Sequence, residues 1–120
     1  MGTVTVIGEI GRNQEELTEV EFLVDTGSLY SMITPALADE LGIEFNGLTT
    51  KILMADSTEM VVPVGLAYMR LQDREGGIIV GAMEVPMPLL GATSLQILGL
   101  KVNPVEETIE QHLPFGPALL

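Results

Sequence analysis

One segment constrains this chain more than any other: residues 20–33, with the sequence VEFLVDTGSLYSMI. A run of branched and aromatic residues ends there at Asp25, and the chain then breaks on Thr26, Gly27 and Ser28. Apolar runs of this kind belong to buried strands, and a carboxylate at a buried strand end is costly unless it is used or neutralised. Asp25 is therefore either an ordinary turn residue, since Asp, Gly and Ser all favour turns, or the chemically active residue of the protein.

The rest of the sequence also favours strands. Residues 3–10 and 17–24 alternate apolar with polar side chains around the polar loop GRNQEE, which predicts a hairpin. Residues 48–54 and 60–71, joined by ADSTE, predict a second and longer hairpin. Pro63 in its second arm predicts an edge or a bulge there. Further short strands are expected at residues 30–33, 78–85 and 100–104.

Two short helices are expected between these strands. The segment TPALADELG has Thr34 as its N-cap, Pro35 at the first helical position and Gly42 at its end. The segment LLGATSLQILG holds a second helix, which Gly99 ends. The helices are followed by ELGIEFNG and ILGLKVNP, which indicates either two related halves or a coincidence of a few identities. The pattern predicts one mainly β domain over residues 1–120, with an ambiguous tail from Val105 onward.

The composition excludes several functions. Seventeen acidic and five basic residues give a net charge of -12, which disfavours binding to a phosphate backbone and hence to nucleic acid. A basic or neutral peptide partner fits better, although the charge also serves solubility alone. The chain has no cysteine and a single histidine, His112, so we expect no disulfide, no metal site and no cofactor.

The sequence shows no signal for secretion or for a membrane. The N-terminal segment MGTVTVIGEI lacks the basic and long apolar regions of a signal peptide. No uninterrupted apolar stretch is long enough to span a bilayer. We therefore expect a soluble, cytoplasmic protein that does not bind membranes.

Three motifs together resemble one family. The segment FLVDTGS resembles the active-site strand and loop of the retropepsin-like aspartic proteases, in their cellular and bacterial branch. The segment MADSTEMVVPVG resembles the flap hairpin of that family, and PLLGATSLQILGLKVNP resembles its second-half signature. The resemblance runs from Thr3 to Pro104. It implies a mainly β, single-domain fold: a closed, barrel-like lobe with a flap hairpin and two short helices, which forms a homodimer.

The chemistry of such a site needs two carboxyl groups. Hydrolysis of a peptide bond by water requires a general base and a general acid, and two adjacent carboxyl groups that share one proton supply both, as in the aspartic protease dyad. This chain has one Asp-Thr-Gly and is too short for two lobes. A second copy must then supply the second Asp25 across a twofold axis.

The resemblance also assigns roles to the neighbours of Asp25. It implies that Thr26 forms a hydrogen bond across the twofold axis and that Gly27 lets the backbone approach the carboxylate and the substrate. It implies that Ser28 donates a hydrogen bond to the outer oxygen of Asp25.

Two further segments are candidates by the same resemblance. Met54, Ala55, Asp56 and Ser57 would cover the substrate as the flap, or would simply form a polar hairpin turn. Many relatives have glycine where this chain has Ser57, which puts the flexibility of the flap in doubt. The segment formed by Leu89, Leu90 and Gly91 is expected to pack behind the active-site loop, in a structural role.

Three hypotheses follow. The first is an aspartic endopeptidase in which water is activated between two Asp25 carboxylates, with apolar side chains flanking the cut. The second is a catalytically inactive dimer that binds peptides or proteins by strand pairing in the same groove. The third is a monomeric acidic β-domain without a groove.

Overall fold

The computed structural model describes residues 3–112, which form nine strands and two helices. The strands are β1 (Thr5–Asn13), β2 (Glu16–Val24), β3 (Ser31–Ile33), β4 (Thr49–Leu53), β5 (Glu59–Leu71), β6 (Arg74–Ala82), β7 (Leu89–Leu90), β8 (Leu100–Asn103) and β9 (Thr108–Gln111). The helices are α1 (Pro35–Leu41) and α2 (Ala92–Leu98). Neither helix, of seven residues each, is long enough to cross a membrane, and no other helix occurs in the described range.

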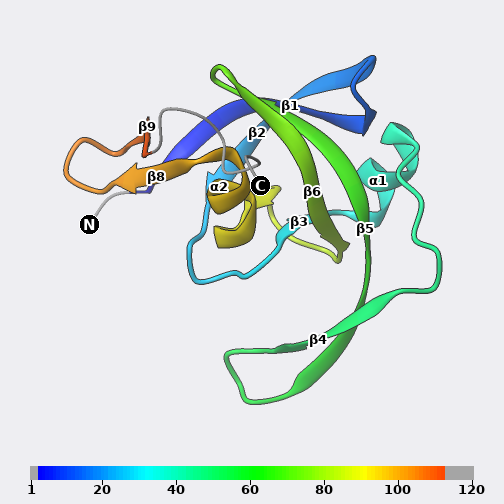
Figure 1. Cartoon of the computed structure of the whole chain (residues 1–120). Helices are drawn as coiled ribbons and strands as arrows, with labels where there is room; N and C mark the ends of the chain where they lie inside the picture. The colour runs from blue at the N-terminus through cyan, green and yellow to red at the C-terminus, as the bar shows by residue number, and fades with distance from the viewer. Residues whose placement is uncertain (1–2, 113–120) are drawn as a thin grey trace.

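Seven of the strands form one sheet that closes on itself. Their order is β1-β2-β7-β3-β6-β5-β4, and β1 also pairs with the last part of β5, at residues 68–70. Strands β8 and β9 form a separate two-stranded sheet beside α2 (Figure 1). The hairpin of β4 and the first part of β5 extends away from the closed lobe (Figure 1). The predicted mainly β fold, with a closed lobe, a projecting hairpin and two short helices, is confirmed.

The two halves of the chain repeat one topology. The antiparallel hairpin β1–β2 corresponds to β5–β6, and the parallel pair β2–β7 corresponds to β6–β3. Strands β3 and β7, which pair with each other, each lead into a short helix. Both helices end on a glycine in the left-handed conformation, with φ of 73° at Gly42 and 68° at Gly99. The weak sequence repeat therefore reflects two related halves.

The local signals for the first helix and the long hairpin are confirmed. Thr34 caps α1, because its side chain accepts a hydrogen bond of 3.1 Å from the backbone N–H of Leu37, and Pro35 lies at the first position. Pro63 pairs with Thr49 of β4, and pairing of β5 with β6 begins only at Val64. The proline thus lies where β5 needs no ladder partner on its other side.

Two boundaries differ from those expected. Strand β1 continues to Asn13, since the residues predicted as a loop pair with β2, and Gly11 also pairs with β5. The actual turn contains only residues 14–15, and the side chain of Asn13 accepts hydrogen bonds from the backbone N–H groups of Glu15 and Glu16. Strand β6, at Arg74–Ala82, begins four residues and ends three residues earlier than expected. The end of the ambiguous tail, residues 113–120, lies outside the described residues.

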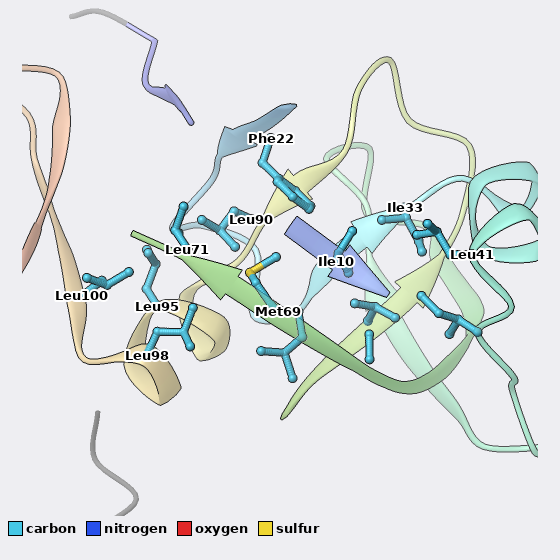
Figure 2. Close-up of a cluster of buried hydrophobic side chains, with 14 of the residues drawn as sticks. Ile10, Phe22, Ile33, Leu41, Met69, Leu71, Leu90, Leu95, Leu98 and Leu100 are labelled. Carbon is cyan, nitrogen blue, oxygen red and sulfur yellow. The ribbon is translucent and has the colours of Figure 1, made fainter. Parts of the chain in front are cut away.

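The core is aliphatic and lies inside the closed lobe (Figure 2). Phe22 of β2 is its one fully buried aromatic side chain in the described range, as the scarcity of aromatic residues requires. Side chains from both halves and both helices contribute; among them are Ile10, Ile33, Leu41, Met69, Leu90, Leu95 and Leu98. Burial of this apolar surface is the main force that holds the strands and helices together.

We predict that the inward face of β1 carries much more stability than its outward face. Ile10 is fully buried, whereas Ile7 on the same strand is 60% exposed. Ile10→Ala should lower the free energy of unfolding by about 2–5 kcal/mol because it leaves a cavity. Ile7→Ala, the matched control, should change it by about 0.5 kcal/mol or less. Chemical denaturation at one fixed protein concentration measures both, and equal losses would contradict the assignment.

Candidate active site

Asp25 follows β2 directly and is held there by the second half of the chain. Its backbone N–H donates a hydrogen bond of 2.9 Å to the carbonyl of Leu90, and β2 pairs in parallel with β7 just before it. The chain then turns, and the N–H of Ser28 donates to the carbonyl of Asp25 at 3.0 Å. These hydrogen bonds fix the backbone of Asp25. The residue is half-buried, so its carboxyl group remains accessible.

The closest hydrogen-bond partner of the Asp25 carboxyl group is the backbone of Gly27. The Gly27 N–H donates to Oδ1 of Asp25 at 3.1 Å. A Cβ atom at position 27 would lie 3.3 Å from the same oxygen. Glycine therefore keeps the space beside the carboxyl group free and orients it. Thr26, between the two, is exposed.

The role expected for Ser28 is wrong in this structure. Its hydroxyl group donates a hydrogen bond of 2.7 Å to the carbonyl of Tyr30, two residues along the chain, and not to Asp25. The reason is local: the chain folds back at residues 28–30, so a nearby carbonyl captures the hydroxyl group. Ser28 thus stabilises the loop, and the backbone of Gly27 is the group that contacts the carboxylate.

The segment around Gly91 supports the loop from behind. The N–H groups of Ala92 and Thr93 donate to the carbonyls of Ser28 and Leu29, at 2.8 and 3.0 Å. A Cβ atom on Gly91 would lie 2.5 Å from the carbonyl carbon and oxygen of Tyr30, so only glycine allows this approach. The structure thus places Leu90 and Gly91 behind the loop.

Two serines that the sequence analysis did not single out join this support. Ser31 and Ser94 are buried, at 0% and 1% exposure, and their hydroxyl oxygens lie 2.7 Å apart. The Ser31 oxygen also accepts a hydrogen bond of 3.0 Å from the N–H of Gly91. The sequence feature that could have indicated them is a serine within each of two largely apolar segments, Ser31 in SMI and Ser94 in ATSLQIL. Their contact clamps β3 to α2 beneath the loop.

The flap is the tip of the hairpin formed by β4 and β5, residues 54–58. The N–H of Met54 donates to the carbonyl of Thr58, and that of Ser57 donates to the carbonyl of Met54, at 2.8 and 3.0 Å. Oδ1 of Asp56 accepts two hydrogen bonds from Thr58, from its hydroxyl group at 2.6 Å and from its N–H at 3.0 Å. Ser57 has a φ of 70°, in the left-handed region that favours glycine. This geometry explains why glycine suits the position.

A groove of about 420 Å³ lies between the flap and the active-site loop. Asp25 lines it from the loop side, and Met54 and Ala55 line it from the flap side. Asp56 and Ser57 at the tip, and Thr26, Leu90 and Gly91, do not line it. The other lining residues are Gly27, Ser28, Leu29, Tyr30, Met32, Thr50, Lys51, Ile52, Leu53, Met83 and Leu89. Met32 and Met83 were not predicted, because the chain brings them to the groove only by folding.

The groove is apolar around one acid. Of the described residues that line it, only Asp25 and Lys51 have a charged side chain. No group of three or more His, Asp or Glu side chains within residues 3–112 is arranged to hold a metal ion. The arrangement suits an extended apolar chain that lies against a single carboxyl group.

The comparisons with known proteins agree with this fold. The family model for aspartyl protease matches residues 4–102, so the chain belongs to the aspartyl protease family. It has the retropepsin-like fold of the retroviral proteases. No curated protein sequence matches the chain.

Two solved structures illustrate the similarity. One is the protease of equine infectious anaemia virus (EIAV) complexed with the inhibitor HBY-793, with a TM-score of 0.65 and 23% identity, covering 85% of this chain and 93% of that chain. The other is the solution structure of the simian foamy virus (mac) protease, with a TM-score of 0.56 and 19% identity, covering 76% of this chain and 90% of that chain. At these identities the likeness establishes the fold alone.

We predict that Gly91→Ala displaces the active-site loop. The new Cβ atom would collide with the backbone of Tyr30, which should destabilise the fold by about 1–3 kcal/mol. Gly77→Ala on β6 is the matched control, because its Cβ atom would meet nothing closer than 4.0 Å; it should be neutral or stabilise by up to about 1 kcal/mol. Thermal denaturation distinguishes the two. Equal stability of both variants would show that the loop does not depend on this contact.

We also predict that the flap tip loosens in acid. The hydrogen bonds from the hydroxyl group and the N–H of Thr58 lower the pKa of Asp56 below its ordinary value. Because the folded pKa is depressed, the stabilisation of the turn is present above the unfolded pKa and is lost as the pH falls through the folded pKa. Thr58→Val should raise the pKa of Asp56 toward its ordinary value.

An NMR titration of the Asp56 carboxyl group measures this pKa. Thr49→Val, at an exposed threonine on β4 of the same hairpin, is the control and should leave it unchanged. Identical titration of Asp56 in the wild type and in Thr58→Val would refute the proposed cause.

Proposed function

We propose that this protein is a homodimeric aspartic endopeptidase. The observation that carries the proposal is the position of Asp25, which lines the groove beneath the flap and also a second hollow on the other side of the loop. A carboxyl group placed between two hollows can face a substrate on one side and a second copy of the chain on the other. The match to the aspartyl protease family supports this reading.

The second hollow has the properties of a dimer face. Its volume is about 410 Å³, and its lining residues are Thr3, Val4, Leu23, Val24, Asp25, Thr26, Val102 and Pro104. If the two Asp25 side chains meet on a twofold axis, the residues around each of them meet their own counterparts. Thr26 is exposed next to Asp25 and would then lie at the axis. Val105, at 84% exposure, adds apolar surface beside Pro104.

The paired carboxyl groups account for the chemistry. One Asp25 is ionised and takes a proton from a water molecule, whose oxygen forms a bond to the carbonyl carbon of the substrate. The other Asp25 is protonated and donates its proton to the carbonyl oxygen, which gives a tetrahedral intermediate. The carbon–nitrogen bond then breaks as the amide nitrogen receives a proton from the dyad. The proton shared by the pair makes acid and base available together.

The flap and the groove account for the binding of substrate. Strand β4 pairs with β5 on one side only, so its other edge is free to bind an extended peptide by strand pairing. Ile52, Met54 and Leu89 supply apolar lining beside Asp25. Closure of residues 54–58 over the peptide would exclude water from the reacting bond. The proposed substrates are extended peptide segments with apolar residues flanking the cut.

The proposal predicts that Asp25→Asn abolishes cleavage and preserves the dimer. An amide cannot act as the general base, so cleavage of a peptide library should fall by about 10²-fold or more. Asp39→Asn, at an exposed carboxylate on α1, is the matched control and should cleave like the wild type. Sedimentation should give the mass of two chains for all three proteins.

Other results would overturn the proposal in distinct ways. A wild type that is inert from acid to neutral pH, and yet dimeric and able to bind peptides, would be an inactive binding module. A wild type with the mass of one chain would lack the second carboxyl group and would refute the mechanism.

A further inference from the structure

Lys51 is the one basic residue of this acidic protein whose charge has no partner within residues 3–112. All five basic residues lie in this range, against a net charge of -12 for the chain. The ion pairs are Arg12–Glu16, Arg70–Glu9, Arg70–Glu75 and Lys101–Glu110. Arg74 is 7% exposed and donates a hydrogen bond to the carbonyl of Leu98. With residues 3–112, the ammonium group of Lys51 makes neither an ion pair nor a hydrogen bond.

Lys51 also lies at the groove. It is on β4, opposite Val61 of β5, and its side chain is exposed. It lines the groove beneath the flap, and within residues 3–112 Asp25 is the only other charged residue of the lining. The free edge of β4, along which an extended peptide would pair, runs past it. A peptide in the groove would therefore meet one positive charge on the flap arm.

The positive charge of Lys51 stands out against the negative net charge of the chain, which bears on where an acidic peptide can bind. A net charge of -12 repels an acidic peptide at long range, but at physiological salt such repulsion is largely screened beyond about 8 Å. Lys51 is the basic residue among the described lining residues of β4, whose other members nearby are the uncharged Thr50, Ile52 and Leu53. Glu59 lies opposite Leu53 on β5 and does not line the groove. An acidic side chain is therefore favoured at one place in the groove.

We propose that Lys51 determines specificity by selecting peptides that carry an Asp or Glu at a fixed distance from the cleaved bond. This inference rests on the proposed endopeptidase function. Lys51 precedes Met54 at the flap tip by three residues, and strands rise about 3.3 Å per residue. A peptide paired with β4 has the same rise per residue as the strand. With the cleaved bond beneath Met54, the peptide residue beside Lys51 is therefore about three positions from that bond. In a twofold dimer, one Lys51 serves each side of the cut.

The experiment uses pairs of apolar peptides that differ only by Glu or Gln, placed two, three or four positions from the cleaved bond. The wild type should cleave the Glu peptide with a kcat/KM about two- to fivefold higher at one of these positions, the range expected for an exposed charge pair. Lys51→Gln should remove the preference, and Lys51→Glu should reverse it. The preference should shrink at 1 M salt, where the screening length is about 3 Å.

Lys101→Glu is the matched control for net charge. It changes the charge of the chain by the same amount as Lys51→Glu, but Lys101 lies on β8, pairs with Glu110 and does not line the groove. It should keep the preference of the wild type for Glu. If Lys101→Glu reverses the preference as well, long-range charge is the cause and the inference fails.

The remaining outcomes separate this inference from the proposed function. A wild type that cleaves the Glu and Gln peptides equally at every position overturns the role of Lys51 and leaves the endopeptidase intact. Equal cleavage together with aggregation of Lys51→Gln would show that Lys51 merely protects the free edge of β4. A wild type that cleaves none of the peptides overturns both proposals.

Discussion

The site depends on backbone pairing between the end of β2 and β7. The N–H of Asp25 donates to the carbonyl of Leu90, and Leu23 and Val24 pair with Leu89 and Leu90 in parallel. The carboxyl group is thus placed by main-chain hydrogen bonds, which leave little freedom of position. Side chains then refine the support: the Ser31–Ser94 contact beneath the loop is buried and fully satisfied, so it holds β3 against α2 without leaving an unpaired polar atom.

The two related halves of the chain have different roles at the site. Both halves contain a hairpin, a parallel strand pair and a glycine-terminated helix. The second strand of the first half, β2, is followed directly by the acid Asp25, whereas the matching strand of the second half, β6, ends at Ala82. The second half instead supports the loop of Asp25 through Leu90 and the residues that follow it. A single copy therefore supplies only one carboxyl group, from its first half. This imbalance is the physical reason for our proposal that a second copy completes the site.

Sequence reasoning succeeded where the structure is determined locally. The cap at Thr34, the proline beside it and the left-handed glycines Gly42 and Gly99 follow from backbone sterics within a few residues. It failed where distant pairing overrides local preference. Gly11 lies in a polar stretch typical of a loop, yet it pairs with both β2 and β5. The hydroxyl group of Ser28 was likewise expected to donate to Asp25, but the path of the folded loop gives it the carbonyl of Tyr30 as its acceptor.

The mainly β class and the position of the acid follow from local sequence signals, because alternating apolar residues and the turn at Asp25-Thr26-Gly27 are encoded over short distances. The surroundings of that acid depend instead on the folded chain. Met32, Lys51 and Met83 line one groove with Asp25 although they are far apart along the chain, and Ser31 meets Ser94 across 63 residues. Such contacts depend on how strands pair across the closed sheet, and no local pattern of residues specifies that pairing.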